Sequence, residues 1–510
     1  MITPLVFQPE LLPAIVDSEL AVLMDSALRL AAAHPGIEDR IDADRDAYAL
    51  KKKGERVLDE QWLNFQGKGF TGLNGYDLAA AAGWADDLRL EDGRPRIPAL
   101  FVFLSILFRG YFGGLKERKS MMLVAESKTM ELLWIGLGLD KMPGASTLSE
   151  NANAVSRETL DMIHRLQLAS VKAEGLDDFL NQTYDSTGVE ANSAFPQDSA
   201  LIMKLVIRAE KLLRSLDLLG ITLHLPSFMA DYIATIRNLN KEIQLSSGKK
   251  NSEKMRKKLY RKMMKLAKKV NKAFAAAHTR ATKKSSVLNV MPSIQRKIDQ
   301  TLDWINVDIH NIKLTVRNTD LRINQEEKVA AEEKVVSVSD ESAALIVKGN
   351  RPAIIGYRPQ IGRSANGFVI GLIVPEGNAN DAGQLRPIVD AARANTGVKP
   401  DVLSFDDGYS NAADRDYYLS EGVGVVSFSG SKGKHIIPEE IYNSKPYVDA
   451  RNMRSAIESL MFTLKDTTDF GELARRGIES VRSELLEKAV VYNLFRAAAL
   501  SKARAKKLAA

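Results

Sequence analysis

The stretch FLNQTYDSTGVEAN (residues 179–192) decides the fold class of this chain. Its β-branched residues and its alternation of apolar and polar side chains predict a β-strand, whereas the sequence before it has helical periodicity. Asp185 lies in the middle of this predicted strand, where an aspartate packs poorly and competes for backbone hydrogen bonds. Asp185 is therefore either a turn residue together with Ser186 and Thr187, or a functional residue.

Further strands are predicted downstream of this stretch, and they alternate with helices. Between them and the first strand lies a long, helical and basic segment, about residues 200–345. This order describes an α/β sheet that is interrupted by a large helical insert. The segments concerned are strands at 343–349, 352–361, 368–378, 401–407 and 422–430, a helix at 381–395 and a helical tail from about residue 450.

The sequence upstream of the first strand predicts helices. KKKGER (51–56) predicts a break in them, and Ser146 or Thr147 followed by Glu150 is typical of a helix N-terminus. The apolar segment 97–108 predicts a buried helix, because it has about half of the roughly 20 residues that a membrane span needs. The predicted parts are an N-terminal helical and linker segment (1–60), a helical bundle (61–175, with helices at 76–88, 97–108 and 125–139), the α/β domain with its insert (176–500) and a basic tail (501–510).

The absence of cysteine limits the chemistry of this 510-residue chain. It excludes disulfides, thiolate metal sites and cysteine nucleophiles, and it favours a reducing cytoplasm. The six histidines are scattered, with no pair at a spacing suited to zinc. A metal site would therefore consist of carboxylates, which favour a hard ion such as Mg²⁺. The first thirty residues also lack the pattern of a secretion signal.

The insert contains a strongly basic predicted helix. Residues 249–272 include 12 Lys or Arg and one acid, Glu253. A solvated surface is the ordinary interpretation of such a run, but the near absence of acids removes the usual intrahelical ion pairs and favours DNA contact. A membrane surface is a weaker alternative, because Trp and Phe are sparse. The apolar stripe of this helix is predicted at Met255, Leu259, Met263, Leu266, Val270 and Phe274, and the predicted DNA contacts are Lys257, Lys258, Arg261 and Lys265.

Two further acids follow the insert. Asp406 ends the predicted strand VLSF, at the kind of strand end where α/β sheets bind ligands. Glu458 lies on the predicted amphipathic helix RSAIESLMFTLK (454–465). Each has an ordinary explanation, since Asp406 or Asp407 suits a turn and Glu458 can pair with Arg454. Together with Asp185, these acids could converge on one or two divalent ions.

The order of these motifs resembles the DDE transposases of bacterial insertion sequences. The resemblance rests on TYDST around the first acid, on Asp-x-Gly-Tyr around the second, and on the Tyr-x2-Arg-x3-Glu-x6-Lys signature around the third. It covers roughly residues 95–500, although only the short motifs are specific. There are two departures: Arg451 stands where the signature has tyrosine, and Asp407 follows Asp406 where a basic or small residue is usual.

The resemblance implies a ribonuclease H-like core that is preceded by an α-helical N-terminal domain. It implies Asp185, Asp406 and Glu458 as catalytic metal ligands for Mg²⁺, with Mn²⁺ as a substitute. Arg454 and Lys465 would contact the backbone of the transposon end. The implied protein is a bacterial, cytoplasmic and nucleoid-associated homodimer with no membrane partner. It would bind the terminal inverted repeats of its element, cleave double-stranded DNA and join the freed end to target DNA.

Two other functions fit the same residues. One is a ribonuclease H-like nuclease that cuts without joining, and the other is a catalytically decayed DNA-binding regulator. The sequence leaves two roles open for several other polar and basic residues. Asn378, Asn380 and Asp381 either support the site or cap the following helix, with capping favoured for Asp381. Lys432 and Lys434 either contact phosphate or face solvent.

Overall fold

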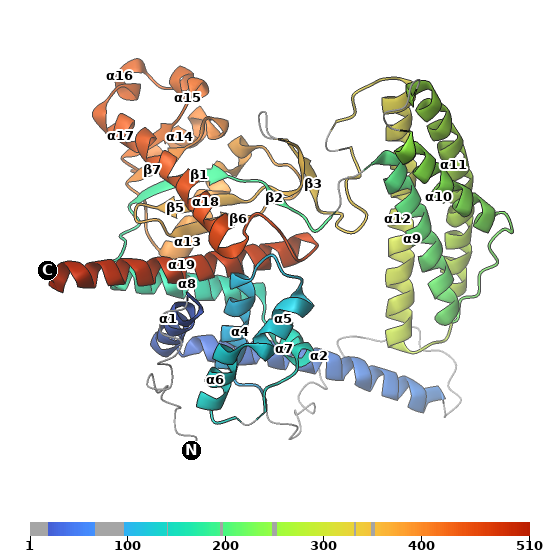
Figure 1. The fold of residues 1–510 in the computed structure, drawn as a ribbon, viewed down its shortest axis with the longest axis horizontal. Coiled ribbons are helices and arrows are strands. Elements are labelled where there is room, and N and C mark those ends of the chain that lie inside the picture. The colour runs from blue at the N-terminus through green and yellow to red at the C-terminus, as the bar shows by residue number, and fades with distance from the viewer. Residues whose placement is uncertain are drawn as a thin grey trace. The chain divides into compact units, whose positions relative to one another are not determined.

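The described residues of the computed structural model are 19–66, 96–139, 141–193, 197–246, 252–330, 333–347 and 352–509. They divide into two compact units (Figure 1). The first draws on Met1–Tyr48, Gly93–Ser193 and Ser342–Ala510, and the second on Ala49–Asp92 and Ala194–Glu341. The helical segment that interrupts the predicted sheet is thus part of a separate unit.

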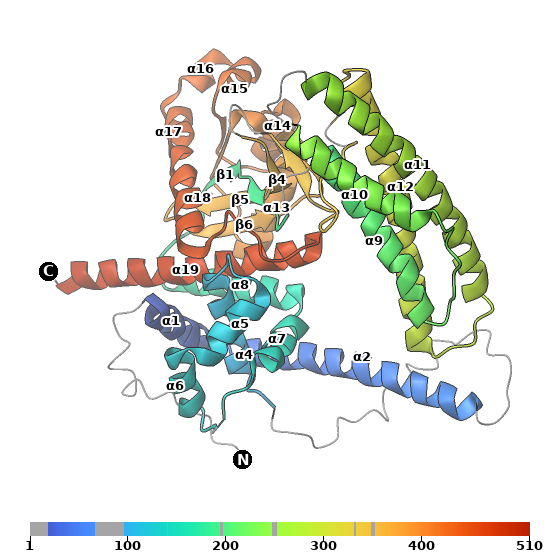
Figure 2. The same ribbon diagram turned by 45° about the vertical axis from the view of Figure 1, so that its right-hand side comes forward.

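Four long helices make up most of the described second unit and run side by side in both views (Figures 1 and 2). They are α9 (Asp198–Leu218), α10 (Met229–Leu245), α11 (Ser252–Ser285) and α12 (Pro292–Asn324). The second unit also includes α2 (Gly36–Gln66) from Ala49 onward. The stripe predicted for α11 is buried at Met263, Val270 and Phe274. Met255 is exposed, contrary to the prediction, because the buried face of α11 begins later and continues through Ala281. Leu259 and Leu266 pack at its margin.

A five-stranded mixed sheet is the centre of the first unit, in the order β6-β5-β1-β7-β8. Figure 2 labels three of its strands, β1, β5 and β6. β1 is antiparallel to β5 and parallel to β7, while β5–β6 is antiparallel and β7–β8 parallel. This arrangement confirms the α/β prediction. The strands are β1 (Asn181–Ser186), β5 (Gln360–Ser364), β6 (Val369–Ile373), β7 (Val402–Phe405) and β8 (Val425–Phe428).

A second, three-stranded sheet lies at the connection to the second unit. It consists of β2 (Val189–Glu190), β3 (Ala344–Ile346) and β4 (Ile354–Tyr357), and both β2 and β3 pair with β4. The single strand predicted at 352–361 is wrong, since the chain forms β4, then Arg358–Pro359, and then β5 in the other sheet. Pro359 has no N–H for a strand ladder, which explains the interruption there.

Helices pack against the five-stranded sheet. α8, α13 and α19 lie on the side of β6 and β5, whereas α17 contacts β7 and β8. α18 approaches the end of β1. The predicted helical tail is therefore three helices. Their bounds are α8 (Arg157–Ala173), α13 (Leu385–Thr396), α14 (Ala412–Ser420), α15 (Ser431–Ile436), α16 (Glu439–Tyr442), α17 (Lys445–Met453), α18 (Ser455–Thr468) and α19 (Ile478–Ala509), with short 3₁₀ turns η3 (Asp381–Gln384) and η4 (Asp407–Tyr409).

The described N-terminal part of the chain is helical, as predicted. The predicted break at 51–56 is wrong, because α2 continues through these residues. The predicted capping by Ser146 or Thr147 is also wrong, since α7 follows Gly144 without a side-chain cap, and Ser156 caps α8 instead. The helix predicted at 76–88 lies outside the described residues. The helices are α1 (Glu19–Ala33), α2 (Gly36–Gln66), α4 (Ala99–Tyr111), α5 (Glu117–Glu126), α6 (Lys128–Gly136) and α7 (Ala145–Ala154).

The apolar helix α4 is buried along almost its whole length. It packs against α19, α5 and α7, which explains an apolar content that exceeds that of its neighbours. Within the described ranges, neither α4 nor any other helix has the length and apolar character of a membrane span.

His164 on α8 makes the stability of the first unit depend on pH. Burial lowers its pKa from 6.5 to about 4, and its Nε2 lies 2.8 Å from the carbonyl oxygen of Val369. A histidine whose folded pKa is depressed contributes stability that is complete above pH 6.5 and is lost as the pH falls toward 4. We expect the free energy of unfolding to fall by about 2 kcal/mol between pH 7 and pH 5 from this residue alone.

Urea unfolding at both pH values measures this effect. His164→Gln keeps a donor for the Val369 carbonyl but cannot titrate, so its stability should change less between pH 7 and pH 5 than that of the wild type. An equal loss in both proteins would contradict the assignment to His164.

Candidate active site

Two of the predicted acids lie at the same edge of the sheet. β1 and β7 are parallel neighbours, and Tyr184 is the register partner of Phe405. The rings of these two residues stack with a centroid separation of 5.1 Å in the core. Because side chains alternate between the faces of a strand, the next residues, Asp185 and Asp406, lie together on the opposite face. Although β1 and β7 are far apart in the sequence, their pairing therefore places two carboxylates side by side.

Arg454 joins these carboxylates to the third predicted acid. Its Nη2 lies 3.1 Å from Oδ2 of Asp185 and 3.5 Å from Oδ1 of Asp406. Its Nη1 lies 3.0 Å from Oε1 of Glu458, one turn further along α18. One guanidinium thus contacts carboxylates from two strands and a helix. We call this group of four side chains the acidic cluster.

The electrostatics of the acidic cluster keep Arg454 charged. Burial alone would lower its pKa, but the negative charges of Asp406, Asp185 and Glu458 outweigh burial and raise the pKa above its ordinary value. The carboxylates differ in exposure, since the side chain of Asp185 is 5% exposed and that of Glu458 is 62% exposed. The cluster therefore begins in the protein interior and opens to solvent at Glu458.

The acidic cluster also answers whether Glu458 forms an ordinary ion pair. It does pair with Arg454 in the i, i+4 arrangement, but the same guanidinium serves both aspartates. In the part of the chain that the structure describes, no three acidic or histidine side chains stand close enough together to hold a metal ion. Carboxylates are nevertheless the donors that Mg²⁺ prefers, so the residue types of the acidic cluster fit a metal ion.

Asp406 and its neighbour Asp407 have different surroundings. Asp406 Oδ1 accepts a hydrogen bond from Ser429 Oγ at 3.2 Å and faces Arg454. Asp407 Oδ1 accepts from the backbone N–H of Gly433 at 3.0 Å, which ties it to the start of α15. The structure therefore places Asp406, and not Asp407, in the acidic cluster.

A buried polar network supports the sheet edge beside the acidic cluster. Tyr409 donates its hydroxyl to Gln360 Oε1, and Gln360 contacts Asp381 at 3.5 Å. Asp381 pairs with Arg358, whose Nε donates to Ser186 Oγ at 3.1 Å. Burial raises the pKa of Tyr409 well above its ordinary value, and the charges of Asp381 and Asp185 add to this, so the phenol stays neutral.

This network contains residues that sequence reasoning missed or assigned wrongly. Capping was the favoured role for Asp381, but η3 has Asn380 at its N-cap position, without a side-chain cap, and the Asp381 carboxylate binds Arg358. Arg358 and Gln360 flank the proline that ends β4, a position that carries no catalytic pattern. Tyr409 belonged to the Asp-x-Gly-Tyr motif, which was the one available signal.

The predicted DNA contacts on α11 lie in unlike environments. Lys257 forms ion pairs with Glu253 at 3.1 Å and with Glu326 at 2.6 Å. Glu326 lies outside α11, so part of the positive charge of this helix is neutralised by an acid that α11 itself does not contain. Arg261 donates to Asn324 at 3.0 Å. Lys258 and Lys265 are exposed, as are the other basic residues of this face. That face consists of Lys254, Lys258, Arg261, Lys262, Lys265, Lys268, Lys269 and Lys272.

The remaining predicted contacts lie around α15 to α18. Lys465 is exposed, with its aliphatic carbons against Gly471. Arg451, at the position of the expected tyrosine, lies over the ring of Tyr442 at 4.6 Å. Lys432 and Lys434 are exposed on α15.

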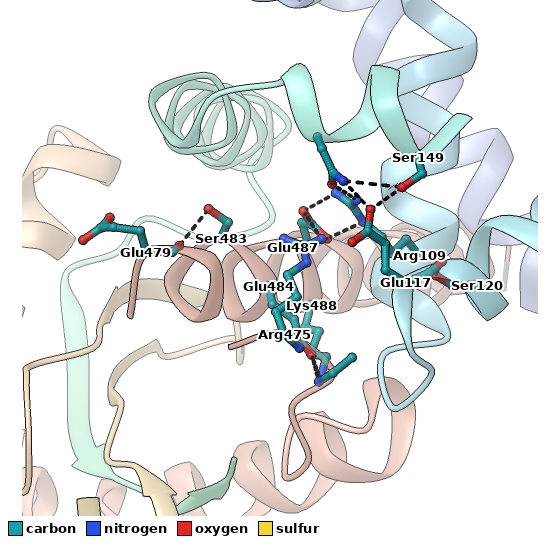
Figure 3. A network of polar contacts seen from close by, with 12 residues as sticks. Arg109, Glu117, Ser120, Ser149, Arg475, Glu479, Ser483, Glu484, Glu487 and Lys488 are labelled. Atoms are coloured by element: carbon teal, nitrogen blue, oxygen red, sulfur yellow. Dashed lines mark hydrogen bonds and ion pairs between the residues drawn. The ribbon is translucent and has the colours of Figure 1, made fainter. Parts of the chain in front are cut away.

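Buried charges on α19 hold the connection that follows α18 (Figure 3). Lys488 is fully buried and donates to the carbonyl oxygens of Asp469 at 3.0 Å and Glu472 at 2.6 Å. Glu484 accepts from the backbone N–H groups of Ala474 and Arg475 at 3.0 and 2.8 Å. Because these bonds fix the backbone directly after α18, they help to position the helix that carries Glu458.

A second buried ion group connects α19 to the N-terminal helices (Figure 3). Glu487 is 2% exposed and accepts from Arg109 of α4 at 2.7 and 3.1 Å. It also accepts from Arg475 at 2.7 and 2.9 Å. Burial lowers the pKa of Arg109, whereas the charges of Glu487 and Glu484 outweigh burial and raise the pKa of Arg475. One carboxylate thus compensates two buried guanidinium groups.

The chain matches a known protein family over part of its length. Residues 319–494 match the family described as "Transposase DDE domain". The matched segment includes Asp406, Arg454 and Glu458, whereas Asp185 precedes it, so the assignment of Asp185 rests on the sheet register and its contact with Arg454. No curated protein and no solved structure matches the chain.

Proposed function

We propose that this chain, which carries a transposase DDE domain at residues 319–494, binds the ends of a transposable element and catalyses metal-dependent cleavage and strand transfer of DNA. The observation that carries the proposal is the acidic cluster, in which Asp185, Asp406 and Glu458 share one cation. The sheet order, with three antiparallel strands followed by two parallel ones, is compatible with a ribonuclease H-like core.

Asp185, Asp406 and Glu458 would hold Mg²⁺, and Mn²⁺ would substitute for it. When bound, divalent ions stabilise negative charge on the attacking and leaving oxygens of a phosphodiester. The chain's own residues do the rest. Arg454 and Lys465 would bind the DNA backbone next to the carboxylates. The network from Tyr409 to Arg358 would keep the ends of β1 and β7 in place.

The basic face of α11 is the proposed surface for double-stranded DNA. Its lysines and arginines face away from the buried stripe, so they are available to neutralise phosphate charge. The N-terminal helices would take part in end recognition. A homodimer is proposed because two transposon ends must be brought together, and both transposon-end and target DNA would be its partners.

A plasmid-based reaction tests this function. The full chain, with Mg²⁺ and a supercoiled plasmid that carries the element's ends, should release the element and join its 3′ ends to a second duplex. Cleaved ends that are never joined would instead indicate a nuclease without strand transfer. Specific DNA binding without any cleavage would indicate a decayed regulator.

The salt dependence of DNA binding separates the basic residues of α11. Each exposed lysine that contacts a phosphate contributes roughly 0.9 to the slope of log K against log salt concentration. We therefore expect Lys258→Gln and Lys265→Gln each to lower that slope by about this amount. Lys257→Gln is the matched control on the same helix, and its effect should be smaller because Glu253 and Glu326 already neutralise the Lys257 ammonium.

Fluorescence anisotropy of a labelled duplex, titrated at several salt concentrations, measures these slopes. Unchanged slopes in both Lys258→Gln and Lys265→Gln would place the DNA on another surface.

A further inference from the structure

We propose that Arg454 is an internal competitor of the metal ions, and that DNA must draw it out of the acidic cluster before the carboxylates can bind metal tightly. The inference rests on the proposed function, since it concerns the same site. It goes beyond that function by making metal binding and DNA binding depend on each other.

The position of the guanidinium is the first argument. Arg454 Nη2 lies between Asp185 and Asp406, at 3.1 and 3.5 Å, where a cation shared by these two carboxylates would also lie. Mg²⁺ binds carboxylate oxygens at about 2.0–2.1 Å and carries two positive charges. A guanidinium in hydrogen-bonding contact with the same oxygens would occupy the space of that ion and repel it. Arg454 and a metal ion are therefore alternative occupants.

The second argument is that Arg454 is incompletely satisfied where it is. Its Nε is buried and has no hydrogen-bond partner among the residues that the structure describes. A buried donor without a partner destabilises the arrangement that contains it. A phosphate oxygen pair can accept from Nε and one Nη together, in the bidentate geometry that arginine favours. DNA would thus offer this side chain a contact that the acidic cluster does not provide.

The place of Arg454 in the chain allows this change without moving the carboxylates. Arg454 is both the C-cap residue of α17 and the N-cap residue of α18, whereas Asp185 lies in β1 and Asp406 directly follows β7. Its side chain is 22% exposed and lies beside the exposed Glu458. A rotation of the side chain toward solvent would free the carboxylates while the backbone stays in place.

The consequence is reciprocal coupling. If DNA favours the outward position of Arg454 and a metal requires it, each must increase the affinity for the other by the same factor. Without DNA the protein should bind metal weakly, which keeps the hydrolytic centre unassembled until a substrate is present.

Direct titration of Mn²⁺ into the full chain tests the inference without relying on activity. Arg454→Gln removes the competing charge, so in the absence of DNA it should bind Mn²⁺ about tenfold more tightly than the wild type, within the range usual for coupled sites. Arg451→Gln is the matched control, because it removes the same charge three residues earlier, at a side chain that lies over Tyr442. It should bind Mn²⁺ as the wild type does.

A second titration adds a short duplex. Mn²⁺ that binds to the DNA itself is subtracted with Asp185→Asn protein and the same duplex. The duplex should strengthen Mn²⁺ binding by the wild type and have little effect on Arg454→Gln. A thermal unfolding transition verifies that Arg454→Gln is folded. Mn²⁺ should raise the Tm of Arg454→Gln more than it raises the Tm of the wild type.

The outcomes separate the inference from the proposed function. Arg454→Gln that binds Mn²⁺ no more tightly than the wild type would overturn the competition, even if Asp185→Asn still abolishes metal binding and cleavage. Unchanged Mn²⁺ binding in Asp185→Asn would instead remove the metal site and the proposed function with it.

Discussion

Asp185→Asn and Asp406→Asn should each lower the rate of DNA cleavage by about 10³-fold or more. Each substitution removes a negatively charged oxygen donor from the place where divalent ions would bind. The stabilisation that such ions give to a phosphoryl transition state amounts to several kcal/mol, and each 1.36 kcal/mol changes the rate about tenfold. Both asparagines keep the size of the side chain, so the packing at the ends of β1 and β7 should be retained. Initial cleavage rates of a labelled duplex that carries the element's end measure the effect.

Asp407→Asn is the matched control for this prediction. It changes the acid adjacent to Asp406, but asparagine can still accept the hydrogen bond from the Gly433 N–H, so the start of α15 should be unaffected. Cleavage should stay within a few-fold of wild type. If Asp407→Asn were inactive and Asp406→Asn active, the assignment of the two acids would be reversed. Full activity in Asp185→Asn would exclude the acidic cluster as the catalytic site.

The largest effect on stability is expected at a distance from the acidic cluster. Glu487→Gln should lower the free energy of unfolding of the first unit by about 3–5 kcal/mol, because removing one partner of a buried ion pair leaves an uncompensated buried charge. Glu487 balances both Arg109 and Arg475, so two guanidinium groups would lose their carboxylate. Urea unfolding followed by circular dichroism, with the midpoint of each transition compared, measures the loss.

Glu479→Gln, on the same helix, is the control. Glu479 is 68% exposed and pairs with Arg482 and Arg157 at the surface, so its loss should cost about 0–1 kcal/mol. Equal destabilisation by Glu487→Gln and Glu479→Gln would show that burial does not decide the strength of these pairs. An unchanged midpoint in Glu487→Gln would show that water or rearrangement compensates the two arginines.

The strands of the main sheet could be predicted because each has a local signal. FLNQTYDSTGVEAN contains both β1 and β2, and VLSF and VVSF are buried runs bounded by turn residues. What the local pattern could not show is where one predicted strand changes sheets. The segment 352–361 looks continuous, and only the pairing of β4 with β2 and of β5 with β1 divides it at Pro359.

The acidic cluster shows the same limit for side chains. Asp185, Asp406 and Glu458 are unusual within their own segments, and that is a local property. The register that puts Tyr184 opposite Phe405 is not local, because β1 and β7 are separated by the whole insert. The sequence allowed Arg454 to pair with Glu458 or to bind phosphate, but the contact of its guanidinium with all three acids depends on how α18 meets the sheet.

The buried ion pair between Arg109 and Glu487 could not be predicted either, because it too depends on contacts between distant segments. Arg109 lies in an apolar helix and Glu487 in a mixed one, and nothing in either segment identifies the other. The pair joins residues that are 378 positions apart in the sequence. Burial of both partners is a result of tertiary packing, which overrides the tendency of such residues to stay in solvent.

The small sheet formed by β2, β3 and β4 has an evolutionary consequence. Residues 194–341 of the second unit follow β2 and precede β3, and both of these strands pair with β4. Backbone pairing with β4 holds the two ends of this segment together. The entropic cost of bringing the two ends together grows only slowly with the number of residues between them. Natural selection could therefore lengthen, shorten or exchange the enclosed module while the chemistry at the neighbouring sheet edge is inherited intact.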